Sequence, residues 1–252
     1  MIRQLRIAFA FLTRLPVGHV DCTARDIGQA ARWFSLVGLF LGAVYAGAAK
    51  ALGGIVPQFV AAVVIVGLDA LLTGAMHFDG LADAADGFGA GRTRDDVLRI
   101  MRDHAIGSYG SCALIVIIAF KVAALGTLIG TSSSLAALLL MPALGRWSSV
   151  FSSALAGYAR SESDDALKSV GSPARFMGYR ELAIATVVLL PAALALRPWR
   201  GAASLLCGSL ATAGWTWICR RKIRGVTGDT LGAGIEFNEC IVLALFTIHW
   251  RA

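Results

Sequence analysis

Charge is what this 252-residue sequence has least of: only 15% of the residues are charged, whereas 57% are hydrophobic and the mean hydropathy is +0.69. A soluble domain usually carries about 25% charged and 45–50% apolar residues. The shortage of charge therefore excludes an ordinary soluble domain, and the many apolar runs exclude a disordered chain. The sequence predicts a membrane protein that crosses the bilayer several times.

Cysteine is also scarce, and no two cysteines form a Cys-x-x-Cys pair. The five are Cys22, Cys112, Cys207, Cys219 and Cys240. An odd number without paired spacing favours small core residues over disulfides or metal ligands.

Several familiar functional signatures are missing as well. No Lys-Ser/Thr follows the glycines of 225–234, which excludes a P-loop. No Ser/His/Asp or Cys/His arrangement suggests a protein nucleophile, and no nucleic-acid module is present. The net charge of +7 is therefore interpreted as basic residues that flank membrane spans.

Apolar runs of roughly bilayer-spanning length dominate the chain. They are 34–55, 59–76, 108–129, 135–157, 182–196, 202–218 and 233–250. The fifth run is short and contains Pro191, and the seventh begins with Glu236 and Glu239, so its first half is alternatively a surface helix. We expect an all-α fold, a polytopic membrane helical bundle of about six or seven transmembrane helices. Without repeats or low-complexity linkers, residues 1–252 are predicted to form a single integral membrane catalytic domain.

The basic residues predict how the chain is oriented in the membrane. Most of the 23 lysines and arginines lie in four polar stretches, 1–33, 77–107, 158–181 and 219–232. The positive-inside rule places these stretches, the N-terminus and the active site in the cytoplasm. The apolar run in the first dozen residues is too short for a signal peptide and is interleaved with arginines. It predicts a helix that lies on the anionic inner leaflet.

The stretch 77–87 carries an unusual cluster of aspartates. Asp79, Asp83 and Asp86 are spaced i, i+4 and i+7, so on a helix that continues the second span they share an arc of roughly 60°. Carboxylates so close repel one another, and a hard divalent cation such as Mg²⁺ removes the repulsion and bridges to phosphate groups. The alternatives are solvated aspartates on an ordinary helix and the cation site of a transporter.

Downstream residues complete a set suited to phosphate chemistry. Arg92, Arg94 and Arg102 offer guanidinium groups that match phosphate oxygens, while His77 and His104 are candidate proton carriers. A second motif, 225–236, predicts a glycine-permitted turn in which Asp229 or Thr230 is the N-cap of the last helix. Such a helix start is an anion site, although a plain capped loop is the alternative.

Lys121 and Arg146 lie inside apolar runs. A cation there needs carboxylate or phosphate partners, or it must reach the membrane surface. Because Lys121 is in mid-span, we expect it to face inward. Magnesium, clustered carboxylates and a phosphorylated substrate support displacement at phosphorus or ionisation of a prenyl diphosphate.

Over most of its length the chain resembles the adenosylcobinamide-GDP ribazoletransferase family, also called cobalamin (5′-phosphate) synthases. The resemblance is carried by Phe11-Leu-Thr13-Arg14-Leu-Pro16, Phe34-Ser-Leu-Val-Gly38-Leu, the block 77–87, Ile100-Met101-Arg102-Asp103, Gly107, Lys121, Tyr158-Ala-Arg160 and Thr227-Gly228-Asp229-Thr-Leu-Gly232-Ala. The acidic block and the Thr-Gly-Asp block together are quite specific for that family.

The resemblance implies a Mg²⁺-dependent transferase of the bacterial cytoplasmic (inner) membrane that performs the final step of cobalamin (vitamin B12) biosynthesis. It would join adenosylcobinamide-GDP to α-ribazole or α-ribazole 5′-phosphate, giving adenosylcobalamin (5′-phosphate) and GMP. Its partners would be these substrates and the lipid bilayer, not nucleic acid, with a homo-oligomer left open.

The resemblance also assigns roles to individual residues. The metal ligands would be Asp79, Asp83 and Asp86, with Asp103 as a further candidate. The first three and His77 are the candidate catalytic residues. Substrate contacts would come from Arg92, Arg94, Arg102, Lys121, Thr227, Gly228 and Asp229.

Three alternatives remain at this point. Asp83-Ala-Ala-Asp86-Gly87 fits the start of the CDP-alcohol phosphotransferase pattern, but the rest of that pattern is absent. A membrane prenyltransferase would have the reverse aspartate spacing. A transporter would place polar residues midway along several spans and show matching halves, and only Asp69, Lys121 and Arg146 are so placed.

Overall fold

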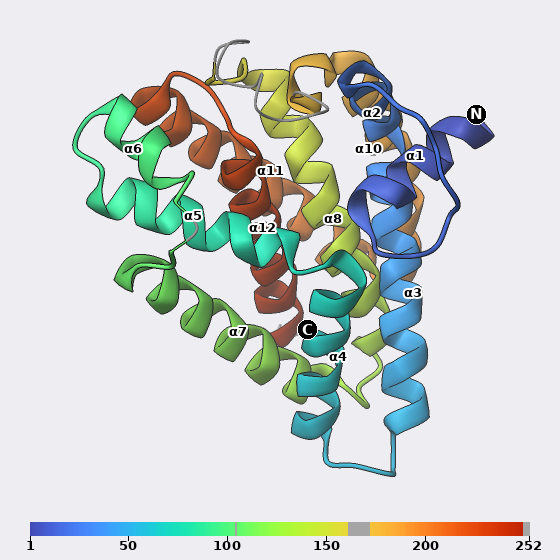
Figure 1. Ribbon diagram of the computed structural model, residues 1–252. Coiled ribbons are helices and arrows are strands. Elements are labelled where there is room, and N and C mark those ends of the chain that lie inside the picture. The colour runs from blue at the N-terminus through green and yellow to red at the C-terminus, as the bar shows by residue number, and fades with distance from the viewer. Residues whose placement is uncertain (104, 161–171, 249–252) are drawn as a thin grey trace.

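The computed structural model describes residues 1–103, 105–160 and 172–248, and these residues form helices without any strand (Figure 1). The helices are α1 Ile2–Leu12, α2 Ala24–Ala30, η1 Ala31–Trp33, α3 Phe34–Leu52, α4 Gln58–Thr73, α5 Met76–Ala90, α6 Arg94–Ile100, α7 Ser108–Leu128, α8 Ser134–Leu155, η2 Pro173–Phe176, α10 Tyr179–Leu196, α11 Pro198–Ile223 and α12 Gly228–Thr247. The prediction of an all-α fold is confirmed.

Long apolar helices account for the predicted spans. Six stretches of the described chain are long and apolar enough to cross a membrane, and the bent pair α4 and α5 raises the number to as many as seven. The predicted bundle of six or seven spans is therefore confirmed. The short fifth run belongs to an 18-residue helix, α10, which continues through Pro191.

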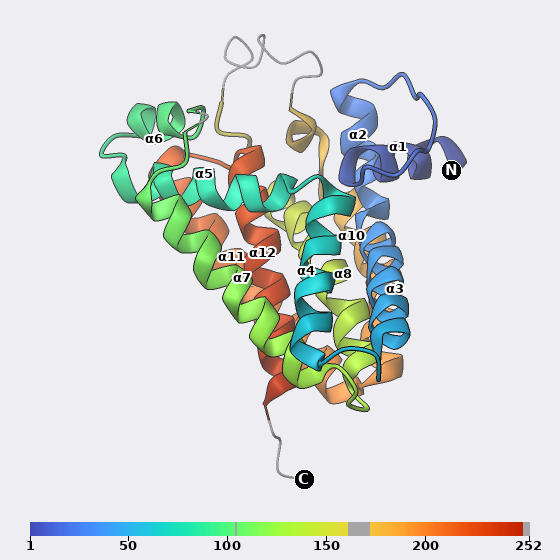
Figure 2. The same ribbon diagram turned by 60° about the horizontal axis from the view of Figure 1, so that its bottom comes forward.

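Helix α8 lies at the centre of the bundle, with α3, α10, α11 and α12 packed around it (Figures 1 and 2). Its contact with α3 depends on small residues. A Cβ atom on Gly38 would lie 2.4 Å from the carbonyl oxygen of Pro142, and one on Gly42 would lie 2.5 Å from that of Leu138. Glycine at these two positions lets the backbones approach closely, which is how helices commonly pack within a membrane.

The chain turns sharply between α4 and α5. Gly74 ends α4 with φ +66°, Ala75 follows with φ +56°, and the two helices are bent by 90°. Residues 77–87 are helical, as predicted. The expectation that they continue along the axis of the second span is wrong, because α5 runs at 90° to α4. Two successive left-handed residues break the helix axis. Helix α5 consequently lies across the end of the bundle (Figure 2).

The first half of the last helix, α12, is buried and does not lie on the surface. Helix α12 packs against α5, α7, α8 and α11, and both Glu236 and Glu239 are fully buried within it. The alternative of a surface helix in its first half is therefore wrong. These carboxylates tolerate burial because cations from neighbouring helices contact them, as described below.

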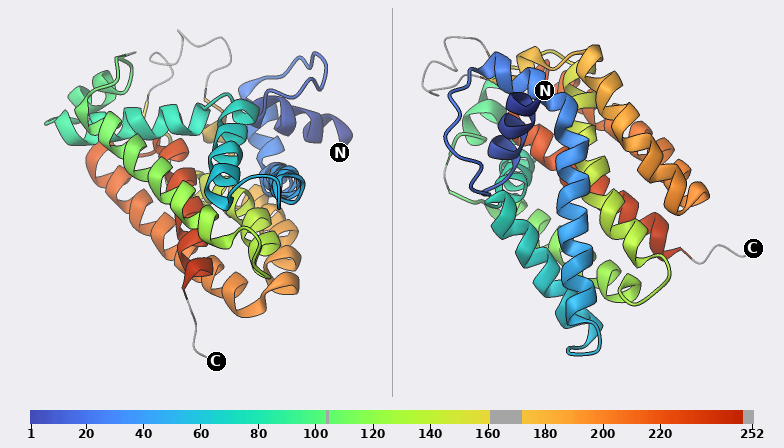
Figure 3. Two further views of the ribbon diagram at one scale, coloured as in Figure 1. Left: turned by 90° about the horizontal axis from the view of Figure 1, so that it is seen from below. Right: turned by 90° about the vertical axis from the view of Figure 1, so that its right-hand side faces the viewer.

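The four shortest α-helices of the described chain gather at one end of the bundle. Helices α1, α2, α5 and α6 lie there (Figure 2), while the loop that joins α3 to α4 lies at the opposite end (Figure 3). The predicted helix in the first dozen residues is confirmed as α1, and Ile7, Ala8 and Leu12 of its inner face are buried. The clustering agrees with the polar stretches predicted to share one side of the membrane.

Cysteine labelling tests which side that is. Ala90, at the exposed end of α5, and Ile55, 76% exposed in the α3–α4 loop, mark the two ends of the bundle. With the native cysteines replaced, we expect Ala90→Cys in intact spheroplasts to resist a membrane-impermeant maleimide until the cells are permeabilised. Ile55→Cys should react at once. Immediate labelling of position 90 would reverse the predicted orientation.

Candidate functional site

The aspartates of α5 meet the start of α12 at the end of the bundle where α5 lies. The two helices approach closely because glycines face the contact. A Cβ atom on Gly80 would lie 2.9 Å from the carbonyl oxygen of Asp229, and one on Gly232 would lie 3.3 Å from that of His77. Asp229 lies 143 residues after Asp86 in the sequence. The tertiary structure nevertheless brings it to the predicted acidic cluster.

The pKa of the Asp83 carboxyl depends on its burial and on the neighbouring carboxylates. Partial burial, followed by the negative charges of Asp229 and Asp79, raises the pKa of the Asp83 carboxyl to about 7. In the described part of the chain, neither Asp79 nor Asp83 has an ion-pair partner. A divalent cation would neutralise the negative charge of these two carboxylates.

Asp229 is held in place by its own helix start and by a buried arginine. Thr227 is the N-cap of α12 and forms a capping box with Thr230, and its hydroxyl oxygen lies 3.2 Å from Asp229 Oδ2. The expectation that Asp229 or Thr230 is the N-cap is wrong by a few positions, because the Thr227 side chain accepts the Thr230 N–H instead. Arg160 Nη2 lies 3.3 Å from Asp229 Oδ2.

Arg160 reaches this place through a short pairing of two distant loops. Ala159 N–H donates to Val226 O at 2.9 Å, and Val226 N–H donates to Gly157 O at 3.0 Å. Glycine at 225 is required there, because a Cβ atom would lie 2.3 Å from Gly157 O. No role was assigned to Arg160 from the sequence, because the pairing that brings it to α12 is not visible in either loop alone.

Asp86 and Asp103 are placed differently from the other predicted metal ligands. The buried Asp86 carboxylate accepts the N–H groups of Gly107 at 2.7 Å and Gly110 at 2.9 Å, so it ties the start of α7 to α5. Asp103 is exposed in the loop before α7 and accepts the Ala105 N–H at 3.1 Å. Of the four predicted ligands, Asp79 and Asp83 are the two that meet Asp229.

A cavity of about 330 Å³, which we call the inner cavity, opens beside the acidic cluster. His77, Asp79, Ser149, Tyr158 and Asp229 are among the side chains that line it. Its volume lies within the range of small-ligand sites. The N-terminus of α12 borders the same space through Gly228, and a helix start is favourable for an anion.

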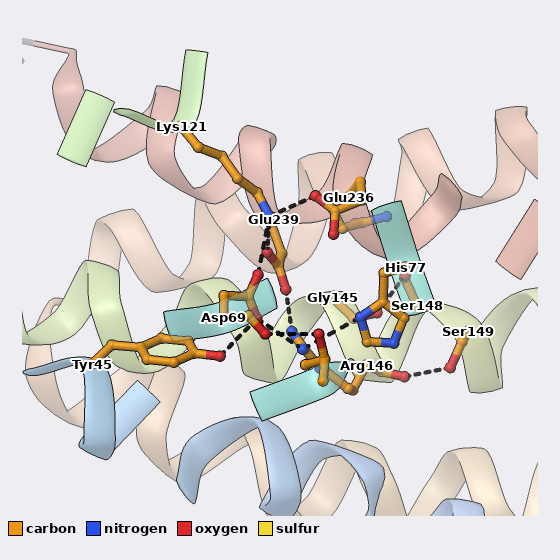
Figure 4. A network of polar contacts seen from close by, with 12 residues as sticks. Tyr45, Asp69, His77, Lys121, Gly145, Arg146, Ser148, Ser149, Glu236 and Glu239 are labelled. Atoms are coloured by element: carbon orange, nitrogen blue, oxygen red, sulfur yellow. Dashed lines mark hydrogen bonds and ion pairs between the residues drawn. The ribbon is translucent and has the colours of Figure 1, made fainter. Parts of the chain in front are cut away.

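His77 is oriented by Arg146 behind it. Arg146 Nη2 lies 3.4 Å from His77 Nδ1, and a guanidinium group can only donate, so Nδ1 acts as the acceptor and the ring proton is on Nε2. His77 Nε2 is buried without a hydrogen-bond partner in the described structure. Figure 4 shows this second nitrogen on the side of the ring away from Arg146. His77 therefore has a buried donor nitrogen without a partner in the described structure, and the residue is among those that line the inner cavity.

The predicted phosphate-binding arginines lie near α6. Arg94 donates to Ile223 O at 3.2 Å and to Ala159 O at 2.5 Å, so it joins the end of α11 to the loop that follows α8. Arg92 and Arg102 are exposed. His104, the second candidate proton carrier, lies outside the described residues.

A second charged cluster lies deep in the bundle (Figure 4). Lys121 Nζ lies 2.5 Å from Glu239, 2.6 Å from Glu236 and 3.5 Å from Asp69. Arg146 contacts Glu239 and lies 3.3 Å from Asp69. The expectations of an inward-facing Lys121 and of carboxylate partners for Arg146 are confirmed.

This deep cluster is also a group of acidic residues that could surround a metal ion. The Lys121 ammonium group already lies among the three carboxylates, where such an ion would be, and Tyr45 donates to Asp69 at 2.7 Å. The protein's own cations, Lys121 and Arg146, therefore already pair with the carboxylates of the deep cluster. The sequence signal that could have found it was the set of charged residues inside apolar runs, but their pairing depends on four separate helices, α4, α7, α8 and α12.

These features define a multi-pass α-helical membrane protein with a carboxylate site at one end of its bundle. A family model for cobalamin-5-phosphate synthases matches residues 4–247, and the chain belongs to that family. The resemblance found in the sequence is thereby confirmed, as is the expectation of an enzyme rather than a transporter.

Curated relatives carry the name adenosylcobinamide-GDP ribazoletransferase. The relative from Syntrophobacter fumaroxidans is 37% identical over 240 residues, 94% of each chain. The relative from Rhizobium etli (strain CIAT 652) is 38% identical over 247 residues, 94% of this chain and 93% of its own. The relative from Thermoanaerobacter pseudethanolicus is 34% identical over 250 residues, 97% of each chain. No solved structure matches the chain.

Proposed function

We propose that this protein catalyses the final assembly step of cobalamin synthesis, in which adenosylcobinamide-GDP and α-ribazole or its 5′-phosphate are joined and GMP is released. The names of its relatives support the activity. The single structural observation that carries the proposal is the meeting of Asp79 and Asp83 of α5 with Asp229 of α12 beside the inner cavity.

The acidic cluster offers the type of ligand that a magnesium ion prefers. Its carboxylates are short, hard ligands. Partial burial raises the pKa of Asp83 first, and the repulsion from Asp229 and Asp79, which a bound ion would relieve, raises it further. Asp79, Asp83 and Asp229 would hold the ion, with Asp86 and Asp103 as the more distant candidates. When bound, magnesium neutralises charge on a diphosphate and helps the nucleotide to leave.

The protein's own groups would position the reacting parts. The N–H groups at the start of α12, beside Thr227 and Gly228, suit a phosphate oxygen, and the Nε2–H of His77 suits a second one. Arg92 and Arg102 are exposed and would contact substrate from that side. Arg94 and Lys121 would act indirectly, since each is engaged in holding neighbouring elements together.

The chemical step is a displacement at phosphorus. A hydroxyl oxygen of ribazole forms a bond to the phosphorus that carries cobinamide, the bond from that phosphorus to the GMP oxygen breaks, and the hydroxyl proton is lost. Such a transfer needs positioning and charge stabilisation rather than a protein nucleophile. The site would open to the cytoplasm of a bacterial cell, in its inner membrane, as the basic residues predict.

A reconstitution experiment tests the proposal. Purified protein in lipid nanodiscs should release GMP from adenosylcobinamide-GDP only when α-ribazole or its 5′-phosphate and Mg²⁺ are all present. Omitting the ribazole compound controls for simple hydrolysis. No GMP from the complete mixture would contradict the function, and full activity in excess EDTA would contradict the role of the metal.

A further inference from the structure

A second cavity, the outer cavity, adjoins the inner one at Asp79. Its volume is about 530 Å³, and it is enclosed by the end of α1, the segment that follows and the sharp turn between α4 and α5. Phe11, Met76 and Asp79 line both cavities. The two spaces therefore meet at a carboxylate of the acidic cluster.

Arg14 supplies the one basic side chain among the described residues that line the outer cavity. Its backbone N–H donates to Leu72 O at 2.6 Å, which fixes it beside the end of α4. Its guanidinium lies over Gly74, where a Cβ atom would come within 2.3 Å of Arg14 Nε. No ion pair neutralises this guanidinium within the described chain. A cation so placed, with Asp79 as the single carboxylate of the cavity, is available to an anionic ligand.

The remaining walls suit a flat apolar group. Ala10, Phe11, Ala75 and Met76 present aliphatic and aromatic surface, and Thr13 and Thr73 add hydroxyl groups. The outer cavity therefore combines an apolar wall, a few hydrogen-bonding groups and one guanidinium. A nucleoside with an aromatic base and a phosphate on its ribose has these same three parts.

The reaction itself requires two binding sites on opposite sides of the reacting phosphorus. In phosphoryl transfer the attacking and leaving oxygens are roughly in line, so the two groups that carry them cannot share one space. The inner cavity has the start of α12 and His77, which suit the phosphate of the departing nucleotide. The outer cavity, which also borders Asp79, remains for the molecule that attacks.

We propose that the outer cavity binds the attacking ribazole and that Arg14 binds its 5′-phosphate. The benzimidazole base packs against Phe11 and Met76, the ribose hydroxyl faces Asp79, and the 5′-phosphate reaches the guanidinium. This inference rests on the proposed function. It addresses whether the acceptor carries a 5′-phosphate, because the family model's name specifies a phosphate on the product and the relatives' name does not. Arg14 is then the residue that distinguishes the two acceptors.

The test compares kcat and KM for α-ribazole 5′-phosphate and α-ribazole in wild-type protein, Arg14→Gln and Arg14→Lys. Arg25→Gln is the matched control, because Arg25 is an exposed arginine at the same end of the molecule and lines neither cavity. For Arg14→Gln we expect kcat/KM with the 5′-phosphate to fall about 10–100-fold, mainly through KM, because a charge-assisted hydrogen bond is lost. With unphosphorylated α-ribazole it should change by less than about threefold, within the ordinary scatter of such effects. Arg14→Lys should retain part of the preference.

The outcomes separate this inference from the proposed function. If wild-type protein forms no GMP with either acceptor, the proposed function fails. If it is active but equal loss is seen for both acceptors in Arg14→Gln, Arg14 is structural and the inference is overturned. The wild-type protein alone gives a test that needs no variant to fold: inorganic phosphate should compete with α-ribazole 5′-phosphate, and absence of competition would overturn the assignment of a phosphate site.

Discussion

Replacing Asp79 or Asp83 by asparagine is expected to lower kcat by about 10³-fold while the protein remains inserted and folded. The substitution keeps the side-chain shape but removes a negative charge from the cluster that would hold magnesium, and loss of one preorganised charge-stabilising group typically costs about 10²–10³ in kcat. Asp229→Asn should behave in the same way, because the structure places Asp229 with the other two. GMP release under saturating substrates measures the effect.

Asp95→Asn is the matched control for this series. Asp95 lies in the same polar stretch, and its side chain is 89% exposed with a surface contact to Arg94. The same chemical change there should leave kcat within about twofold, because exposed ion pairs contribute little. If Asp79→Asn and Asp83→Asn retained wild-type turnover, the acidic cluster could not be the metal site.

The second large effect that we expect is a loss of stability when Lys121 is replaced by methionine. Lys121→Met removes one of two cations that face three fully buried carboxylates, and breaking a buried ion pair in this way typically costs about 3–5 kcal/mol. We expect a strong fall in the temperature at which the detergent-solubilised protein aggregates, together with a lower yield of inserted protein. The apolar side chain fits the span, so the loss comes from the carboxylates left unpaired.

Two further variants make this prediction specific. Lys121→Met combined with Glu236→Gln removes one charge of each sign and should recover much of the lost stability, as a double-mutant cycle would detect. Lys50→Met, an exposed lysine at the other end of the bundle, should leave the aggregation temperature nearly unchanged. Wild-type stability in the single Lys121→Met variant would show that the buried contacts contribute nothing to folding.

The predicted spans were accurate because burial in lipid leaves a local signal. A run of apolar residues long enough to cross the bilayer must be helical, since every backbone N–H and C=O needs a partner within the segment. The run 108–129 became α7 Ser108–Leu128, and 135–157 became α8 Ser134–Leu155. The acidic face of α5 was equally local, because i, i+4 and i+7 spacing places side chains on one side of any helix.

The direction of α5 was not predictable in this way. Gly74 is a common C-cap, but Ala75 in the left-handed region is unusual for a residue with a Cβ atom, and the hydropathy pattern contains no trace of the 90° bend. The same bend moves the aspartates from the line of the second span to the end of the bundle. There they meet α12, which the sequence alone could not place.

The sequence by itself determined the helical class, the spans, the family and the aspartates of the acidic block, because each of these depends on residues near one another in the chain. Only the tertiary structure decided that Asp229 joins Asp83, that Lys121 contacts Glu236 and Glu239, and that Asp79 borders two cavities. The physical reason is that electrostatic contacts and cavities depend on distances in space, and packing of glycines on facing helices sets those distances without leaving a periodic pattern in the sequence.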